Sequence, residues 1–272
     1  MKAETQESGV LTAILAETAE RMAARAPERP EWERLAARAQ PAPSLRRALS
    51  GGTVGVIAEV KRRSPSAGEI RPGADAVQLA RLFAEAGASG ISVLTEERRF
   101  GGSLEDLMQV ARAVGLPTLR KDFILDPIQV YEARMVGASA ILLIVRALSD
   151  ERLGELAALA GQIGLETLVE VHSAAELARA VLVRPDMIGV NARDLDTLVL
   201  DTSLAATLLP MVPAGMLAVA ESGLKTRRDV ERVAGFGAAA VLVGTAVAGA
   251  SDPREALAGL VGVEKRVREL ES

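Results

Sequence analysis

From Thr53 onward, short apolar runs rich in β-branched residues alternate with longer runs rich in Ala, Leu, Arg and Glu. The short runs predict strands and the longer runs predict helices. Strands are expected at Val54–Val60, Gly90–Leu94, Pro117–Lys121, Ala138–Val145, Leu165–Val171, Asp186–Val190, Met216–Ala220 and Ala239–Val243. Helices are expected at Ala76–Ala86, Leu104–Val114, Pro127–Val136, Asp150–Ile163, Ala174–Val181, Thr202–Leu208, Arg227–Ala234 and from Pro253 onward. Strict alternation of the two elements predicts a parallel sheet.

Eight such repeats favour a closed barrel over an open, doubly wound sheet. The open alternative loses support because no G-x-G-x-x-G motif follows the first predicted strand. We therefore expect an α/β protein, a (β/α)8 TIM barrel with an N-terminal helical extension. Residues 51–272 form the barrel, and residues 1–50 form the extension, with helices at Val10–Ala26 and Trp32–Ala39. We expect the extension to cap one barrel end rather than to act as an independent partner-binding module.

Composition narrows the classes of function. Of the 272 residues, 49% are hydrophobic but only 2% are aromatic, so the core must consist of Ala, Val, Leu and Ile. The net charge is −4 with both signs interspersed, and no basic tract suggests nucleic-acid binding. Cysteine is absent, which excludes disulfides, thiolate metal sites and a cysteine nucleophile. A single histidine, His172, makes a metal site an unfavourable interpretation.

Nothing in the sequence suggests a membrane or an export route. No apolar run reaches the roughly 18 residues that a transmembrane helix needs. The first twenty residues carry Glu early and lack the apolar stretch and cleavage site of a signal peptide. We therefore expect a cytoplasmic protein with no membrane partner.

Polar residues stand where the apolar run of several predicted strands stops. Side chains two positions apart share a face of a strand, which pairs Glu59 with Lys61, Glu170 with His172 and Asn191 with Arg193, while Lys121 and Glu221 end their own strands. The carboxyl ends of barrel strands meet at one mouth, where active sites lie. Because an unpaired buried charge is costly, we expect these groups to compensate one another in one cavity. The alternative is a separate salt bridge from each to a flanking helix.

The last two strands end in glycine-containing segments, Glu221–Gly223 and Gly244-Thr245. The loops after the seventh and eighth strands of such barrels commonly bind phosphate through backbone N–H groups, and glycine allows close approach of the anion. The two segments together therefore predict a phosphate site. For His172 we favour a hydrogen-bonded place at the strand end over direct acid–base catalysis.

Seven segments, in this order and spacing, carry a family resemblance. They are EVKRRSPS (Glu59–Ser66), FGGS (Phe100–Ser103), LRKDFI (Leu119–Ile124), AILLIV (Ala140–Val145), LVEVH (Leu168–His172), GVNARDL (Gly189–Leu195) and ESG (Glu221–Gly223). Together they closely resemble the indole-3-glycerol phosphate synthase family of tryptophan biosynthesis, from about residue 10 to residue 265. One departure is Thr245, where Glu or Ser is more often expected, so the side-chain part of phosphate binding stays open.

The resemblance implies a small-molecule substrate, 1-(2-carboxyphenylamino)-1-deoxyribulose 5-phosphate, closed to an indole with loss of carbon dioxide and water. It implies no metal and no organic cofactor. We also expect a monomer, although the oligomeric state is not readable from the sequence. The catalytic residues it implies are Glu59, Lys61, Lys121, Glu170, Asn191 and Glu221. Lys121 matches the proton donor to the ketone, and we expect neighbouring cations to lower its pKa. Glu170 matches the acid–base group of the dehydration, and which of Lys61 and Lys121 donates at each step stays open.

The resemblance also implies the binding residues. The substrate's carboxylate, ring and sugar would contact Ser64, Pro65, Phe100, Phe123, Leu142, Arg193 and Leu195, and its phosphate would contact Ser222, Gly223, Gly244 and Thr245. The N-terminal extension is expected to cover the mouth and help to hold substrate. Phosphoribosylanthranilate isomerase is a weaker alternative, because that enzyme usually works with a cysteine. A non-catalytic sugar-phosphate-binding barrel is disfavoured because Lys121 and Glu170 are both present.

Overall fold

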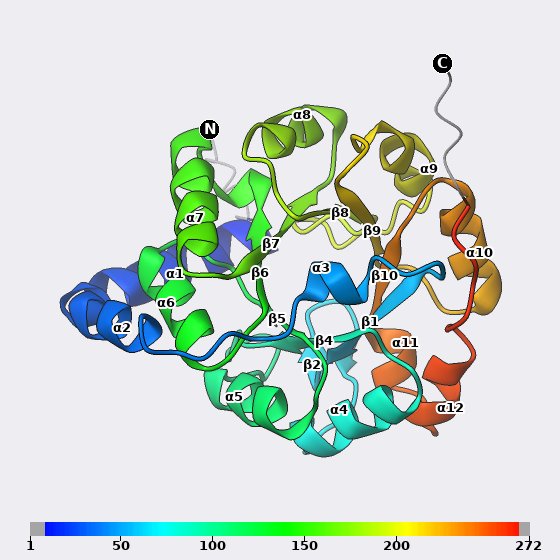
Figure 1. Ribbon diagram of the computed structural model, residues 1–272, viewed down its shortest axis with the longest axis horizontal. Coiled ribbons are helices and arrows are strands. Elements are labelled where there is room, and N and C mark those ends of the chain that lie inside the picture. Colours follow the sequence, from blue (N-terminus) through cyan, green and yellow to red (C-terminus); the bar gives the residue numbers. More distant parts are fainter. Residues whose placement is uncertain (1–8, 267–272) are drawn as a thin grey trace, which may run out of the picture.

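The computed structural model describes residues 9–266, and in it eight parallel strands close into a barrel (Figure 1). In chain order they are β1 (Gly55–Val60), β4 (Gly90–Leu94), β5 (Thr118–Lys121), β6 (Ala140–Ile144), β7 (Glu166–Val171), β8 (Met187–Asn191), β9 (Leu217–Glu221) and β10 (Ala240–Val243). Neighbours in sequence are neighbours in the ring, and β10 pairs with β1 to close it. The predicted barrel and all eight predicted strands are confirmed.

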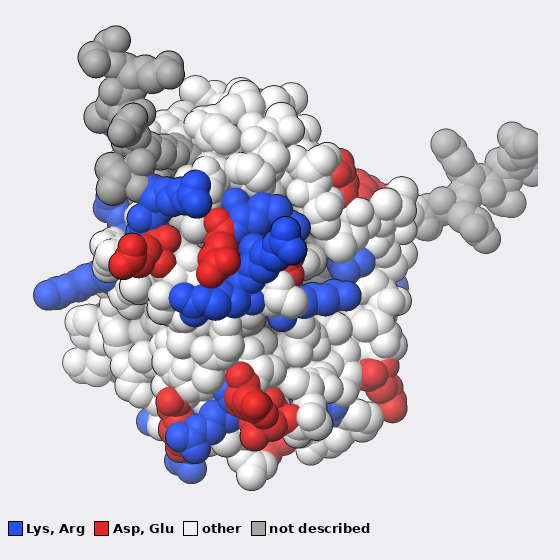
Figure 2. Space-filling view, turned by 90° about the vertical axis from the view of Figure 1, so that its right-hand side faces the viewer, with Lys and Arg blue, Asp and Glu red and all other residues white. Residues whose placement is uncertain are grey.

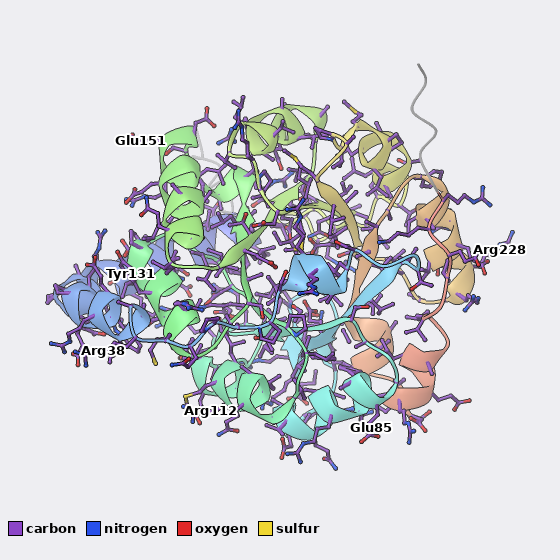
Figure 3. The ribbon with its side chains drawn as sticks, in the orientation of Figure 1. Arg38, Glu85, Arg112, Tyr131, Glu151 and Arg228 are labelled. Atoms are coloured by element: carbon purple, nitrogen blue, oxygen red, sulfur yellow. The ribbon has the colours of Figure 1, made fainter. Side chains whose placement is uncertain are left out.

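Helices follow the strands and surround the ring (Figure 1). They are α4 (Ala76–Glu85), α5 (Leu104–Ala113), α6 (Pro127–Met135), α7 (Asp150–Gln162), α8 (Ala174–Leu182), α9 (Leu204–Leu208), α10 (Arg227–Gly235), α11 (Thr245–Ala248) and α12 (Pro253–Ala258), with 3-10 turns η2 (Val145–Ala147) and η3 (Leu209–Met211). Several begin at a Ser, Thr or Asp whose side chain accepts a backbone N–H, which satisfies a donor that the first turn leaves free. Glu85, Glu151 and Arg228 point outward from this layer (Figure 3).

Alternation along each strand divides the core into two parts. In β1, Val56, Ala58 and Val60 face outward and pack in the layer between barrel and helices. Ile57 faces the lumen, where it packs with Leu119 and Leu168 of other strands. The period of two therefore sends the remaining lumen-facing residue of β1, Glu59, toward the same interior. As the composition predicts, aliphatic residues make up most of this core.

The N-terminal extension contains α1 (Val10–Arg25), η1 (Ala26–Glu28), α2 (Arg29–Ala36) and α3 (Leu45–Ala48). The last of these, with the residue that follows it, plugs the amino-terminal end of the barrel: Leu45 of α3 and Leu49 just after it are both fully buried. The strands β4 and β1 begin there with Gly90 and Gly55. Glycine is needed at both positions, because a Cβ on either would collide with one of these leucines. Figure 1 shows α3 at the centre of the ring.

The first helix lies along the opposite rim, at the mouth. Gly9 lies against the side chain of Asp196 in the loop after β8. Glu17 accepts hydrogen bonds of 2.7 Å from Arg99 in the loop after β4. The buried Leu11 and Ile14 pack in the lumen cluster. The extension thus reaches both ends of the barrel, with α3 at the amino-terminal end and α1 at the mouth.

A small hairpin lies outside the barrel ring. The loop after β1 contains this hairpin of β2 (Arg63–Ser64) and β3 (Gly68–Glu69), which the sequence patterns did not predict.

On the face shown in Figure 2, Lys and Arg side chains gather with Asp and Glu among them, and uncharged residues cover most of the rest. Within residues 9–266, no helix has the length and apolar character needed to cross a membrane.

Candidate active site

A single cavity opens at the carboxyl ends of the strands and gathers the predicted site residues. Every predicted site residue except Gly223 lines it: Glu59, Lys61, Ser64, Pro65, Phe100, Lys121, Phe123, Leu142, Glu170, Asn191, Arg193, Leu195, Glu221, Ser222, Gly244 and Thr245. Gly223 lies behind Ser222 and lines a smaller hollow instead. The strand-end argument thus located the cavity, since its charged members come from five different strands and the segments after them.

Sequence reasoning missed part of the apolar lining. Leu94, Ile144 and Leu242 also face the cavity. Each lies at or near the end of its strand, in β4, β6 and β10 respectively, on the lumen side. The period of two that places the charged residues in the lumen applies to these three residues as well, but an apolar strand end does not stand out from the rest of an apolar strand.

Lys121 occupies the centre of the polar part. Its Nζ lies 3.2 Å from Oε2 of Glu170 and 3.1 Å from Oε2 of Glu221. Asn191 donates from Nδ2 to the other oxygen of Glu170 at 3.1 Å, which fixes the orientation of that carboxylate. A second pair joins Lys61 Nζ to Glu59 Oε1 at 2.6 Å. All three glutamates are almost completely buried.

The expectation of a lowered pKa for Lys121 is wrong. Burial disfavours the ammonium, but the carboxylates of Glu221, Glu170 and Glu59 outweigh burial and raise the pKa of Lys121. The sequence suggested nearby cations, whereas the structure surrounds this lysine with anions. Lys121 is therefore a charged ammonium in the resting site, able to donate charge-assisted hydrogen bonds.

The two carboxyl groups beside Lys121 differ in their pKa. The pKa of Glu221 is raised to about 7. Burial and the repulsion from Glu170 and Glu59 raise it, and together they outweigh the attraction of Lys121, which lowers it. Burial acts the same way on Glu170, but Lys121, His172 and the bond from Asn191 together lower its pKa. At neutral pH the site therefore holds an ionised Glu170 next to a Glu221 that exchanges its proton readily.

His172 lies outside the cavity lining, behind Glu170. Its Nε2 is 3.3 Å from Glu170 Oε1, and its Nδ1 is 3.3 Å from Glu176 Oε2. Its backbone N–H donates to Glu176 at 2.8 Å. This geometry agrees with the predicted hydrogen-bonded place at the strand end and leaves contact with a ligand to Glu170.

The apolar part of the cavity is a slot between two phenylalanines and aliphatic residues. The Phe100 and Phe123 ring centroids are 6.3 Å apart and tilted by 43°, a geometry in which aromatic rings attract each other. Leu142 and Leu195 belong to the same apolar cluster. A flat aromatic group fits such a wall, with Lys61 and Ser64 available at its edge for an anionic substituent.

The remaining end of the cavity consists of backbone-rich loops. Ser222 and Gly223 follow β9 with φ of 67° and 76°, two consecutive left-handed residues that turn the chain sharply. Gly244 and Thr245 follow β10. A Cβ on Gly244 would collide with the carboxylate of Glu59, so glycine keeps this wall of the cavity open. Loops of this kind suit an anion such as phosphate.

Comparisons with known proteins give one consistent result. A family model described as indole-3-glycerol phosphate synthase matches residues 11–260. The indole-3-glycerol phosphate synthase of Leifsonia xyli subsp. xyli is 48% identical over 253 residues, covering 93% of this chain and 97% of the relative. That of Parafrankia sp. is 52% identical over 213 residues, covering 78% and 80%.

Solved structures are similar in fold. A 3-hexulose-6-phosphate synthase matches with a TM-score of 0.63 at 15% identity, covering 76% of this chain and 98% of that one. A thiamine phosphate pyrophosphorylase from Pyrococcus furiosus matches with a TM-score of 0.59 at 20% identity, covering 80% and 96%. At this level of identity the likeness concerns the barrel alone.

Proposed function

The chain belongs to the indole-3-glycerol phosphate synthase family, and we propose that the cavity at its barrel mouth is where the reaction takes place. Its activity is that of a carboxy-lyase of tryptophan biosynthesis. The substrate is 1-(2-carboxyphenylamino)-1-deoxyribulose 5-phosphate. The observation that carries the site assignment is the position of Lys121, held between two buried carboxylates beside an apolar slot.

Ring closure needs an acid at the ketone. The ring carbon that bears the carboxylate attacks the ketone carbon, and the carbonyl oxygen takes up a proton as the new bond forms. Lys121 supplies that proton or stabilises the oxygen by a charge-assisted hydrogen bond. Its raised pKa keeps it protonated before the step, and the adjacent carboxylates of Glu170 and Glu221 hold it in place.

Loss of carbon dioxide and then of water completes the indole. Decarboxylation restores aromaticity to the ring without any protein group entering the bond. Dehydration requires one group to protonate the departing hydroxyl and another to remove a proton from the neighbouring carbon. We assign the acid–base work of this step to Glu170, with Glu221 next to it as a proton store whose pKa is about 7.

The rest of the cavity holds the substrate. Lys61 and Ser64 bind the substrate carboxylate, and the slot that contains Phe100 and Phe123 binds the aromatic ring. Arg193 and Asn191 bind around the sugar. Phosphate is bound by Ser222, Gly244 and Thr245, and Gly223 shapes this loop from behind.

We also assign residues 1–50 to a cap that completes the site and residues 51–272 to the catalytic barrel. We propose a monomer that works in the cytoplasm. Among the described residues, few large apolar side chains are strongly exposed, namely Leu182, Val199, Leu200 and Met211. Only Val199 and Leu200 are adjacent in the chain, and so small a set of exposed apolar residues is ordinary on a monomer. Sedimentation equilibrium would test it.

The experiment that tests the function is direct. Purified protein should convert the substrate to a product with indole fluorescence, with saturation kinetics and without an added cofactor. Equilibrium binding of substrate with no turnover, under conditions where a related synthase is active, would instead support a non-catalytic sugar-phosphate-binding barrel.

A further inference from the structure

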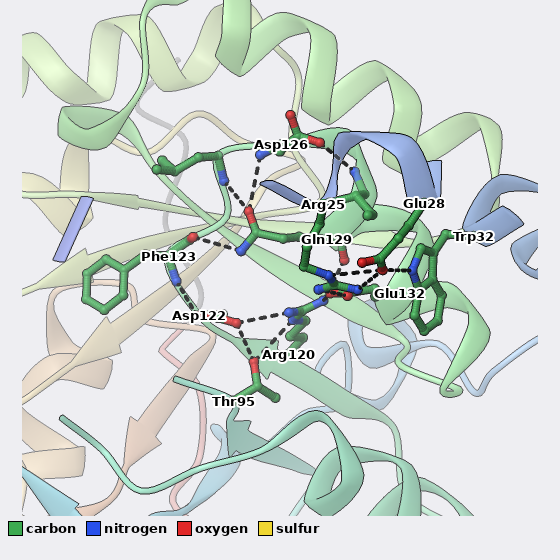
Figure 4. A network of polar contacts seen from close by, with 12 residues as sticks. Arg25, Glu28, Trp32, Thr95, Arg120, Asp122, Phe123, Asp126, Gln129 and Glu132 are labelled. Carbon is green, nitrogen blue, oxygen red and sulfur yellow. Dashed lines mark hydrogen bonds and ion pairs between the residues drawn. The ribbon is translucent and has the colours of Figure 1, made fainter. Parts of the chain in front are cut away.

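A buried polar cluster lies behind the catalytic strand β5 (Figure 4). Arg120 precedes Lys121, so its side chain leaves the opposite face of the strand and points toward the helices. Only 5% of that side chain is exposed. Its guanidinium donates to Thr95 Oγ1 at 3.1 Å, the Gln129 carbonyl at 2.7 Å, Glu132 Oε2 at 2.9 Å and Asp122 Oδ2 at 3.0 Å.

The cluster fixes the backbone of Phe123, which lines the apolar slot. Asp122 accepts the N–H of Phe123 on Oδ1 at 2.9 Å, and its other oxygen accepts from Arg120. The carbonyl of Phe123 accepts from Nε2 of Gln129 at 3.0 Å. Both polar atoms of the Phe123 backbone are therefore held by buried side chains, two residues past Lys121.

The positive and negative charges of this cluster are equal only when an arginine of the N-terminal extension is included. Behind β5, Arg120 contributes one positive charge, while Asp122 and Glu132 contribute two negative charges. Arg25, at the end of α1, lies 2.5 Å from the second oxygen of Glu132. Glu132 is 3% exposed and Arg25 is 28% exposed, so Arg25 reaches the buried carboxylate from the surface.

Arg25 is itself held in place. Glu28 accepts from its NH2 at 2.8 Å, and the Trp32 ring lies 5.8 Å from its guanidinium carbon. Trp32 also donates to Glu28 at 3.1 Å (Figure 4). Such a prearranged guanidinium loses little freedom on pairing with Glu132.

We propose that Arg25 is a positioning residue, which sets the place of Lys121 and Phe123 through Glu132 and the cluster of Arg120 and Asp122. Without Arg25, Glu132 is a buried carboxylate that must share Arg120 with Asp122. Removal of one partner from a buried ion pair is costly, and a shift of Arg120 toward Glu132 weakens the hold of Asp122 on Phe123.

This inference rests on the roles proposed above for Lys121 and Phe123. It differs from a covering role of the extension, because Arg25 acts from the outer side of the barrel wall. A cover that only retains substrate changes KM. A displaced acid and a displaced ring slot change kcat, and a misplacement of about 1 Å can cost roughly 100-fold in rate.

The test uses the full chain with Arg25→Gln, Arg25→Lys, Glu132→Gln and the double variant Arg25→Gln/Glu132→Gln. Arg34→Gln is the control, since the Arg34 side chain is 63% exposed and its ion pair with Glu31 is long, at 3.8 Å. Two quantities are measured: kcat and KM by product fluorescence, and amide hydrogen exchange of residues 121–126 by mass spectrometry. The exchange measurement requires no turnover.

We expect Arg25→Gln to lower kcat by about 10- to 100-fold and to speed exchange across residues 121–126. Arg25→Lys keeps the charge but lacks the planar fork that contacts Glu28 and Trp32, so its kcat should lie between those of wild type and Arg25→Gln. Arg34→Gln should match wild type in both measurements. In the Glu132→Gln background, Arg25→Gln should have little further effect, because the unpaired carboxylate is gone.

Unchanged exchange in a folded Arg25→Gln protein overturns the inference, whatever its activity. So do additive effects in the double variant. If Arg25→Gln alone fails to fold, the double variant must restore folding, and failure to do so also overturns it. Absence of turnover in the wild-type protein would refute the proposed function, while the exchange comparison would still decide whether Arg25 holds this segment.

Discussion

Lys121 and Glu221 end two different strands, β5 and β9, and their Nζ and Oε2 atoms lie 3.1 Å apart. Pairing with a lysine ordinarily lowers the pKa of a carboxyl group, yet burial and the neighbouring Glu170 raise the pKa of Glu221 to about 7. Burial alone would lower the pKa of Lys121, but the carboxylates of Glu221, Glu170 and Glu59 raise it. The site therefore keeps a permanent ammonium beside a carboxyl group that can gain or lose a proton near neutral pH.

Lys121→Ala should abolish turnover far more than it weakens substrate binding. A donor to the carbonyl oxygen acts mainly in the transition state, so its loss appears in kcat. General acid catalysis contributes about 10²- to 10⁴-fold, and the variant also leaves Glu170 and Glu221 without the cation between them. The measurement is product fluorescence across a substrate titration.

Retention of more than about a tenth of wild-type kcat, a deficit below the lower end of that range, would assign the acid to another residue. Lys61 is then the first candidate, because it lines the same cavity and is paired with Glu59 at 2.6 Å. Lys61→Ala measured beside Lys121→Ala separates the two, since a residue that only binds the substrate carboxylate changes KM.

Glu221→Gln should stabilise the fold increasingly as pH rises. The folded pKa of Glu221 is about 7 and its ordinary value is 4.5, so between these values the native state binds more protons than the unfolded state. The contribution of Glu221 to stability is thus fully present below about 4.5 and is lost as pH rises through 7. Glutamine mimics the protonated form and avoids this loss.

The measurement is urea unfolding of both proteins at pH 5, 6, 7 and 8. The stability of Glu221→Gln minus that of wild type should grow across this range by a few kcal/mol at most, since one pKa unit corresponds to about 1.4 kcal/mol. A difference that stays constant with pH would show that Glu221 titrates at its ordinary value in the folded protein.

The barrel and most of its mouth could be predicted from the sequence, because both depend on local periodicity. Glu59 and Glu170 stand two residues from other lumen-facing positions, and the period of two alone sends them inward. Leu94 was not predicted, because an apolar residue at the end of an apolar strand does not stand out in the sequence. Gly223 is predicted at the phosphate from the pair of glycine-containing strand ends and from the family resemblance, whereas the backbone angles that place it behind Ser222 cannot be read from the sequence.

Relationships between distant segments could not be predicted. The pKa of Lys121 depends on which charges from other strands surround it, and the sequence does not show which of those charges lie nearest to its Nζ. Leu45 plugs the barrel from a helix of four residues, too short for a periodic signal. Arg25 meets Glu132 across more than a hundred residues of chain, and neither residue stands in a recognisable pattern.

Arg193→Ala should act chiefly on KM. The Arg193 side chain lines the cavity, and its NH1 donates to the carbonyl of Leu198 at 2.8 Å, so its cation is fixed before substrate arrives. A preplaced cation binds the ground state and the transition state of an anionic substrate alike, which is the condition for an effect on KM with kcat retained. Arg112→Ala, on the exposed face of α5 (Figure 3), is the control. A kcat loss as large as that of Lys121→Ala would instead place Arg193 in the chemical step.

Gly244→Ala should damage catalysis by displacing the Glu59–Lys61 pair. The φ of Gly244 is −130°, outside the left-handed region, and the expected cost is that of the added methyl group. That methyl would collide with the Glu59 carboxylate and lie 3.0 Å from Lys61 Nζ.

We expect kcat/KM to fall by roughly 100-fold, the size of effect that an ångström-scale misplacement produces. The matched control is Gly154→Ala in α7, where a Cβ meets nothing within 4 Å and where alanine should stabilise the helix by about 0.5–1 kcal/mol. Steady-state kinetics and thermal unfolding of both variants decide the matter. Wild-type kinetics in Gly244→Ala would mean that the Glu59–Lys61 pair tolerates displacement. Glu59 would then leave the set of catalytic residues, because a group that can move by the width of a methyl without effect does not act on the reacting atoms.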